Sequence, residues 1–256
     1  MSAVFREAKL KIQRAVKHIN DLNVILGEFS KRQTREVLVE HDPNGGDDIL
    51  KVRATETLPD SFSLTLGDAL HNLRTSLDYV IAEIEFTFIG SRSDYTRFPV
   101  DQSMDALKAR LEGGLAKRAP KQVIDCIVES VQPYTGGNGD FICSLNDLDI
   151  EDKHRLLIAK TEFKHVNGIV LIDDQGKETR IATWQIRNNL VASHLLKGLR
   201  QSKVKDHGIA SFEVLFGDAL PFAGYTIVPA MRKLTHAVAA TVNEIEYWFL
   251  RSQAGV

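Results

Sequence analysis

The residues of this chain that could carry chemistry gather in two stretches, residues 61–90 and residues 145–159. In the first stretch, leucines and isoleucines recur at helical spacing and form one apolar stripe. At 100° per residue, five positions follow one edge of that stripe: Gly67, His71, Arg74, Asp78 and Glu85. Side chains at such an edge face either water or a seam between helices. Arginine and histidine beside carboxylates could bind an anion or transfer a proton.

The second stretch, LNDLDIEDKHRLLIA, offers matching charges. If it is helical, Leu148, Asp152, Arg155 and Ala159 share one face, so two charges stand among apolar neighbours. A charge in such a place needs a partner. We therefore expect the two stretches to meet, with Arg74 near Asp152 and Asp78 near Arg155. Histidines 71 and 154 should then lie close by.

Three interpretations of this cluster differ in chemistry. The leading one is a structural polar cluster that fixes the register of two helices, a common role of buried ion pairs. The second is a small pocket for an anion or nucleotide, with His71 or His154 as proton carrier. The third is a metal site, and its candidate ligands are His71, Asp78, Asp149, Asp152 and His154. No HxxxH or HExxH spacing supports that site, so we predict neither a metal nor a cofactor.

Three long helices should position these residues, at about 2–30, 61–90 and 228–251. Each shows apolar residues at alternating spacings of three and four, which is a heptad-like seam. The seams comprise Phe5, Ala8, Ile12, Ala15, Ile19, Leu22, Leu26 and Phe29; Leu66, Leu70, Leu73, Leu77, Ile81, Ile84 and Phe88; and Met231, Leu234, Val238, Val242, Ile245 and Phe249. The first two helices should pack antiparallel, and the seams leave room for a homodimer.

Between the helices the apolar period shifts toward two, which indicates strands. We expect antiparallel hairpins at about 34–57, 162–184 and 209–228, with turn clusters such as PNGG between their strands. Residues 184–203 fit either a helix or a strand followed by a long loop. No linker or repeat divides the chain. The prediction is a single α+β domain over residues 1–256, a bundle of long helices packed with β-hairpins.

Composition points to an ordinary soluble protein. The chain has 256 residues, is 43% apolar and 26% charged, and has a net charge of −2. Charge therefore gives no support to nucleic-acid binding. The N-terminus lacks the apolar core of a signal peptide, and the most apolar run is too short to cross a bilayer. With two cysteines and no CxxC motif, we expect a reduced, cytoplasmic protein without membrane contact.

Four ordered motifs carry a resemblance to a known family. The runs GDALHNLRTSLDYV, FPV, QPY and LNDLDIEDKHRLLI resemble those of a widespread family of uncharacterised bacterial proteins, across residues 60 to 160. This chain has Tyr79 where many members have histidine. The resemblance implies a bacterial origin but no activity. The positions that it singles out are His71, Asn72, Arg74, Asp78, Asp152, Lys153, His154 and Arg155.

A second, weaker resemblance is to helical nuclease-like domains of the HEPN type. Such domains carry an Arg-x4-6-His motif, often with Asn after the Arg, and cleave RNA without metal. Arg187, followed by Asn188, has six residues between it and His194, and on a helix the two would be nearly aligned. Such spacings also arise by chance in a chain of this composition, and fold-level analogy is a weak warrant.

Together these observations predict a bacterial binding or interaction protein. Its site should lie where the helix at 61–90 meets the segment 149–155, and its partner would be a small anionic ligand or another protein. The alternative is a HEPN-like, metal-independent ribonuclease of a toxin or defence system, with Arg187 and His194 as the catalytic candidates.

Overall fold

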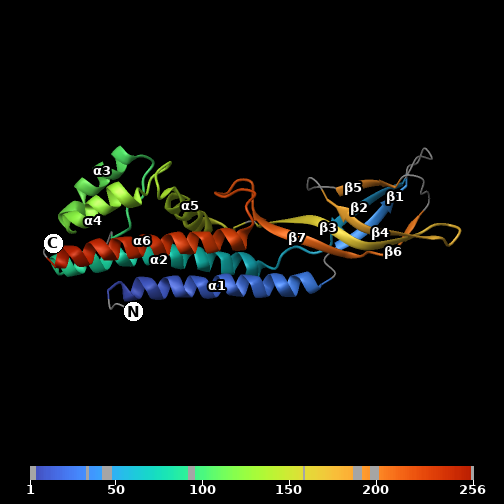
Figure 1. Cartoon of the computed structure of the whole chain (residues 1–256), viewed down its shortest axis with the longest axis horizontal. Coiled ribbons are helices and arrows are strands. Elements are labelled where there is room, and N and C mark those ends of the chain that lie inside the picture. The colour runs from blue at the N-terminus through green and yellow to red at the C-terminus, as the bar shows by residue number, and fades with distance from the viewer. Residues whose placement is uncertain are drawn as a thin grey trace. The chain divides into compact units, whose positions relative to one another are not determined.

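The structure, a computed structural model, describes residues 4–32, 35–41, 48–91, 96–157, 159–186 and 202–254, and the backbone of 192–196. It has an α+β fold, as predicted, with helices and two antiparallel sheets (Figure 1). The chain divides into two compact units. The helical unit comprises Met1–Val24, Asp60–Ile158 and Phe216–Val256, and the sheet unit comprises Ile25–Pro59 and Ala159–Leu215. The sequence predicted a single domain over 1–256, and that remains a prediction, because two compact units can belong to one domain.

The three long helices form as predicted: α1 (Arg6–Lys31), α2 (Asp60–Ile89) and α6 (Ile227–Gln253). The start of α1 lies beside the ends of the other two, because the Phe5 amide donates to Glu83 Oε1 at 2.9 Å and the rings of Phe5 and Phe249 stack at 5.5 Å. The start of α1 therefore runs antiparallel to α2 and α6 (Figure 1).

Most seam residues of these helices are buried within the one chain. The buried members in the helical unit are Phe5, Ala8, Ala15, Ile19, Leu22, Leu66, Leu70, Leu73, Leu77, Ile81, Ile84, Met231, Leu234, Val238, Val242, Ile245 and Phe249. Phe88 is an exception, because it is 51% exposed. The start of α1 lies beside Glu83 of α2, and Phe88 is five residues further along α2. Helix α1 therefore does not reach far enough to cover Phe88. The seams are thus used inside the monomer, and the homodimer stays a prediction.

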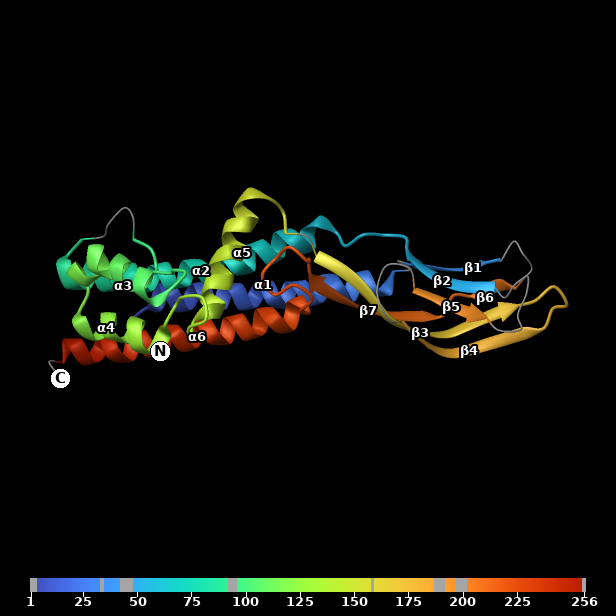
Figure 2. The same ribbon diagram turned by 90° about the horizontal axis from the view of Figure 1, so that it is seen from above.

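Shorter helices complete the helical unit. They are α3 (Met104–Gly113), the 3₁₀ helix η1 (Leu115–Lys117), α4 (Lys121–Asp125), the π-helix η2 (Cys126–Val131) and α5 (Asp140–His154). Ser103 caps α3 by accepting a hydrogen bond from the Ala106 amide, which is the standard N-cap arrangement. Helix α5 lies across α2 and α6, as the two ribbon views show (Figures 1 and 2).

The sheet unit contains two of the predicted hairpins. Strands β1 (Arg35–Glu40) and β2 (Asp48–Ala54) pair antiparallel, and so do β3 (Ala159–Ile172) and β4 (Glu178–Gln185). Strand β5 (Ala192–Leu196) joins β2, while β6 (Lys203–Asp206) and β7 (Ile209–Phe216) join β3. Both sheets supply one core, whose buried residues are Val37, Leu50, Val52, Val166, Ile169, Leu171, Trp184 and Ile186.

The third predicted hairpin, at 209–228, is wrong in its second half. After β7 the chain turns and enters α6 at Ile227 instead of forming another strand. The Phe216 amide donates to the Tyr225 carbonyl at 3.0 Å, and the Gly224 amide donates to the Phe216 carbonyl at 3.2 Å. These bonds close a compact loop. The apolar residues that alternate in its sequence include Phe222 and Tyr225, whose rings pack against each other in the loop and do not belong to a strand.

Candidate functional site

Helices α2 and α5 do meet, and side-chain hydrogen bonds connect them. His71 Nδ1 lies 3.0 Å from Asp149 Oδ1, and Arg74 Nε donates to Asn146 Oδ1 at 3.1 Å. Each bond joins two residues that are more than 70 positions apart in sequence. The expected meeting of the two segments is therefore present in the helical unit.

Arg74 is the buried centre of this contact, with 6% of its surface exposed. Its guanidinium donates to Asn146, to the Asp78 carboxylate on its own helix and, through Nη2 at 3.2 Å, to the carbonyl of Phe98. A buried guanidinium must be compensated in this way, because desolvation of an unpaired charge is very costly. Arg74 thus links α2, α5 and the loop before α3.

Asp78 completes the same network. Its Oδ1 also accepts a hydrogen bond from the Phe98 amide at 2.7 Å. Arg74 and Asp78 therefore satisfy both backbone polar groups of Phe98, a residue that is 2% exposed. We call Arg74, Asp78, Asn146 and Phe98 the buried network, and its geometry is that of a structural link.

The two ion pairs expected from the sequence, Arg74 with Asp152 and Asp78 with Arg155, do not form. Asp78 does not meet Arg155, because α5 ends at His154 and Arg155 adopts an extended conformation, 68% exposed in its side chain and bonded to Glu151. Asp152 does not meet Arg74 because it packs against Gly67, seven residues earlier and so about 10 Å away along α2.

A second, more exposed part of the contact surrounds Asp149. Its side chain is only 4% exposed and accepts from His71 Nδ1 and, at 2.5 Å, from Lys153 Nζ. Both partners are about half exposed, at 53% and 54%. An ionised carboxylate only accepts hydrogen bonds, so His71 Nδ1 carries the proton. His71 Nε2 lies 3.3 Å from Thr75 Oγ1.

Asp152 stands beside this group. Burial, together with the nearby carboxylates of Asp149 and Asp68, raises the pKa of Asp152 above its usual value. A Cβ added at Gly67 would lie 2.2 Å from Asp152 Oδ2, so the absence of a side chain at Gly67 leaves room for the Asp152 carboxylate in its present position. The sequence reasoning placed Gly67 on the edge of the stripe but did not assign it this role.

The remaining predicted residues have local roles or lie apart. Asn72 donates to the Asp68 carbonyl of its own helix at 2.7 Å and is 9% exposed, and His154 is exposed in the last turn of α5. Within the part of the chain that the structure describes, no group of three His, Cys, Asp or Glu residues is placed to hold a metal ion.

The nuclease candidates do not share a described helix. Arg187 lies outside the described residues, and His194 lies in strand β5, opposite Leu50 of β2. Of the two alternatives for 184–203, the described backbone of 192–196 is therefore strand. The helical alignment on which the HEPN-like hypothesis depended is not found there.

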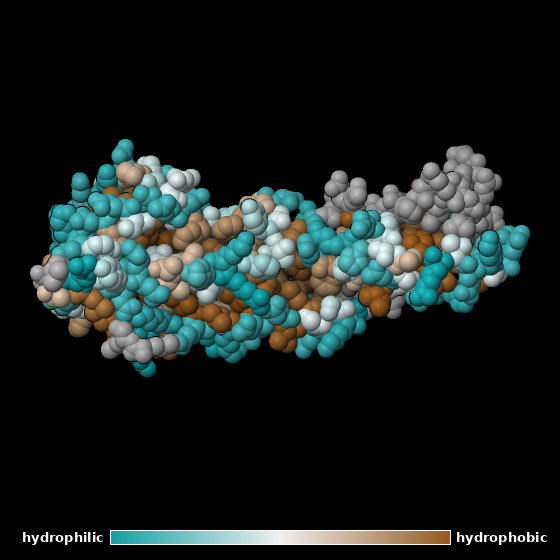
Figure 3. Space-filling model, in the orientation of Figure 1, coloured by the Kyte–Doolittle hydropathy of each residue, from teal (hydrophilic) through white to brown (hydrophobic). Residues whose placement is uncertain are grey.

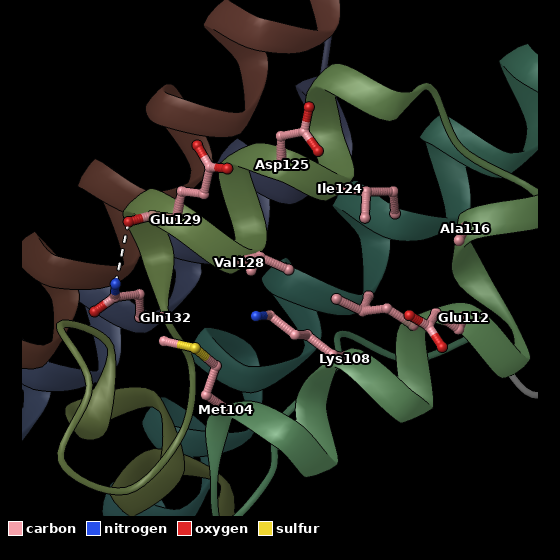
Figure 4. Close-up of a pocket in the computed structure, with 10 residues that line it drawn as sticks. Met104, Lys108, Glu112, Ala116, Ile124, Asp125, Val128, Glu129 and Gln132 are labelled. Carbon is pink, nitrogen blue, oxygen red and sulfur yellow. Dashed lines mark hydrogen bonds between the residues drawn. The ribbon is translucent and has the colours of Figure 1, made fainter.

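A cavity that the sequence reasoning missed lies between α3 and the α4–η2 segment. It has a volume of about 530 Å³, and its lining includes the apolar residues Met104, Ile124 and Val128 (Figure 4). Lys108 extends from α3 toward Val128 on the opposite wall. We call this cavity the α3–η2 groove. Its lining residues are Met104, Lys108, Leu111, Glu112, Ala116, Ile124, Asp125, Val128, Glu129 and Gln132.

The wall formed by η2 has an unusual backbone. The Gln132 amide donates to the Ile127 carbonyl at 2.9 Å, five residues back, and Gln132 then adopts a left-handed conformation with φ 51°. Left-handed backbone is uncommon for residues other than glycine, and π-helical turns are frequent at functional sites. The Gln132 side chain donates to the Glu129 carbonyl and accepts from the Asn138 amide, at 3.2 and 3.3 Å.

The polar rim of the groove is mainly acidic. Three carboxylates, Glu112, Asp125 and Glu129, face a single lysine, Lys108, among the lining residues. Asp125 is already paired, because Lys121 donates to its Oδ1 at 2.8 Å. Cys126, the first residue of η2, is buried, and burial raises the pKa of its thiol to about 12. That thiol therefore stays protonated at neutral pH and is a poor nucleophile.

Comparisons with family models, curated proteins and solved structures found no match to this chain. The family resemblance carried by the four motifs thus stays a prediction. No helix in the described ranges is long and apolar enough to cross a membrane. The function has to be argued from the geometry of the helical unit.

Proposed function

We propose that this chain is a non-catalytic binding protein and that the α3–η2 groove is its ligand site. The observation that carries this proposal is the groove itself, about 530 Å³ with apolar and charged lining residues. Ligand sites in proteins are typically cavities of this size. The buried network between α2 and α5 then serves as framework, because its charges are paired with one another.

Charge suggests the class of ligand. Three carboxylates against one lysine give the lining a net negative charge, even though Lys121 compensates Asp125. A ligand that combines an apolar body with an amine would bury its body against Leu111 and Val128 and place its charge near Glu112 or Glu129. An anionic ligand, expected from the sequence for the α2–α5 contact, would be repelled at this rim.

The residue types in the groove support binding over catalysis. Its described lining includes no histidine, cysteine or serine, so it offers no hydroxyl or thiol nucleophile paired with a histidine base. The histidine of the helical unit that bonds to a carboxylate at 3.0 Å, His71, belongs instead to the α2–α5 contact.

Calorimetric titration with 4-phenylbutylamine and with the neutral 4-phenylbutanol tests the proposal. The amine should bind about tenfold more tightly, and the double variant Glu112→Gln/Glu129→Gln should lose most of that preference while it still binds the alcohol. Glu7→Gln, an exposed change on α1, is the matched control and should behave as wild type. Equal affinities for amine and alcohol in the wild type would refute the proposed charge preference.

The ribonuclease alternative is tested separately. Purified protein is incubated with single-stranded RNA in the presence of EDTA, and His194→Ala and Arg187→Ala variants are compared with wild type. Cleavage that both substitutions abolish would replace the binding proposal with the nuclease one. Intact RNA, or cleavage that both variants retain, would remove the nuclease alternative.

A further inference from the structure

A second cavity, which we call the aromatic pocket, lies between the start of α5, the loop 217–226 and the first turns of α6. It has a volume of about 380 Å³. Its walls are mostly apolar and include the rings of Phe141, Phe222 and Tyr225 together with Leu234 of α6. None of these residues lines the α3–η2 groove, so the pocket is a separate site.

The loop that carries two of the rings is held in one conformation. Its ends are joined by the backbone hydrogen bonds between Phe216 and Tyr225 and between Gly224 and Phe216, at 3.0 and 3.2 Å. Phe222 adopts a left-handed backbone with φ 62°, which is unfavourable for an aromatic residue. Its ring packs 6.0 Å from that of the buried Phe216, and this contact helps to hold the strained conformation.

The rings leave an apolar surface open to solvent. Tyr225 is 61% exposed and its ring lies edge-on to Phe222 at 6.2 Å. Hydrophobic and hydrophilic residues alternate over the surface of this unit (Figure 3), so apolar exposure alone is ordinary. What distinguishes this place is that one exposed and two half-buried rings wall a cavity large enough for a ring or a short hydrocarbon chain.

Lys233 supplies the one charge among the lining residues. It is exposed at the rim on α6, and within the described chain no carboxylate forms an ion pair with it. Its ammonium can therefore meet the charge of a ligand whose body fills the pocket. The sign is opposite to that of the α3–η2 groove, where carboxylates prevail.

We infer that the aromatic pocket binds a small monocarboxylate with an aromatic or branched hydrocarbon body, the carboxylate pairing with Lys233. The body would pack between Phe141, Phe222 and Tyr225, and edge-to-face contacts would favour an aromatic ring. This inference goes beyond the proposed function, because it concerns a different cavity and the opposite charge of ligand.

The test is titration of the full chain with 4-phenylbutyrate and, as its neutral counterpart, 4-phenylbutanol. The wild type should bind the carboxylate about fivefold more tightly than the alcohol. Lys233→Met keeps the aliphatic stem and should abolish this preference while it retains alcohol binding. Arg232→Met, the neighbouring exposed cation outside the pocket, should keep the preference. A preference that survives in Lys233→Met would overturn the assignment.

A second variant locates the ligand. Ala237 lines the pocket, so Ala237→Leu should reduce the free volume of the pocket. We expect the affinity for 4-phenylbutyrate to fall tenfold or more. An unchanged thermal midpoint of unfolding is the folding control. Glu112→Gln/Glu129→Gln should leave 4-phenylbutyrate binding unchanged, which separates this inference from the proposed function. Wild-type affinity in Ala237→Leu, or no carboxylate binding by the wild type, would contradict the inference.

Discussion

Two arginine–carboxylate pairs in the helical unit share one sequence spacing and differ in the burial of the arginine. Arg74 and Asp78 on α2, and Glu151 and Arg155 at the end of α5, are both four residues apart. The Arg74 side chain is 7% exposed and that of Arg155 is 68% exposed. The first pair also satisfies the backbone of Phe98, whereas the second lies at a helix end and its arginine faces water.

The difference shows that spacing identifies a pair but burial decides what the pair does. An exposed pair at this spacing contributes about 0.3–0.5 kcal/mol, because water and salt screen it and the side chains lose entropy. A buried pair adds little net stability over an apolar replacement, but removal of one partner leaves the other charge desolvated. The buried network should therefore be intolerant to single changes and the exposed pair indifferent to them.

The largest expected effect is that of Arg74→Met. The change removes the cation that pairs with the Asp78 carboxylate, which keeps only the Phe98 amide as donor, and it leaves the Phe98 carbonyl without the Arg74 donor. We expect it to lower the free energy of unfolding by about 3–5 kcal/mol. Arg155→Met is the matched control and should lower the free energy of unfolding by about 0.5 kcal/mol or less. Urea denaturation followed by circular dichroism measures both. Similar losses in the two variants would break the comparison.

A double-mutant cycle measures the coupling within each pair. We expect Arg74→Met and Asp78→Asn to couple by about 1–3 kcal/mol, because they share the Phe98 backbone as a third partner. The corresponding cycle of Arg155→Met and Glu151→Gln should give about 0.3–0.5 kcal/mol. Additive losses for Arg74 and Asp78 would mean that the buried network does not act as a unit.

The smallest expected effect concerns Asp152, whose carboxyl lies between these extremes of exposure. Because its pKa is raised in the folded protein from the ordinary 3.8, the folded state binds more protons than the unfolded one as pH rises past that value. The Asp152 carboxyl therefore contributes to the stability of the folded wild type below pH 3.8, and this contribution is lost as the pH rises through the pKa of Asp152 in the folded protein.

Asp152→Asn should therefore be slightly more stable than wild type at pH 7 and equal to it at pH 3.5. Thermal melting of both proteins at the two pH values measures the difference, and the pair at low pH serves as the internal control. An equal gain at both pH values would show that packing against Gly67, not the charge of the carboxylate, sets the effect.

The sequence alone determined the elements of the helical unit and much of the sheet unit. Helical and alternating periods gave the three long helices to within a few residues and two of three hairpins, because these signals depend on neighbours three, four or two positions away. The meeting of α2 and α5 also followed from sequence, since Asp152 and Arg155 were expected among apolar neighbours and the edge of α2 offers Arg74 and Asp78 as complementary charges.

Only the tertiary structure decided which partners those charges have. Helix α5 ends at His154, so Arg155 lies beyond the helix in an extended conformation. Arg74 donates to the backbone carbonyl of Phe98, 24 residues away, and a pattern of side chains cannot predict a bond to a backbone carbonyl. The α3–η2 groove likewise depends on a π-helical register and a left-handed Gln132. Such features arise from packing between distant segments, whereas periodicity records only the local preference of the chain.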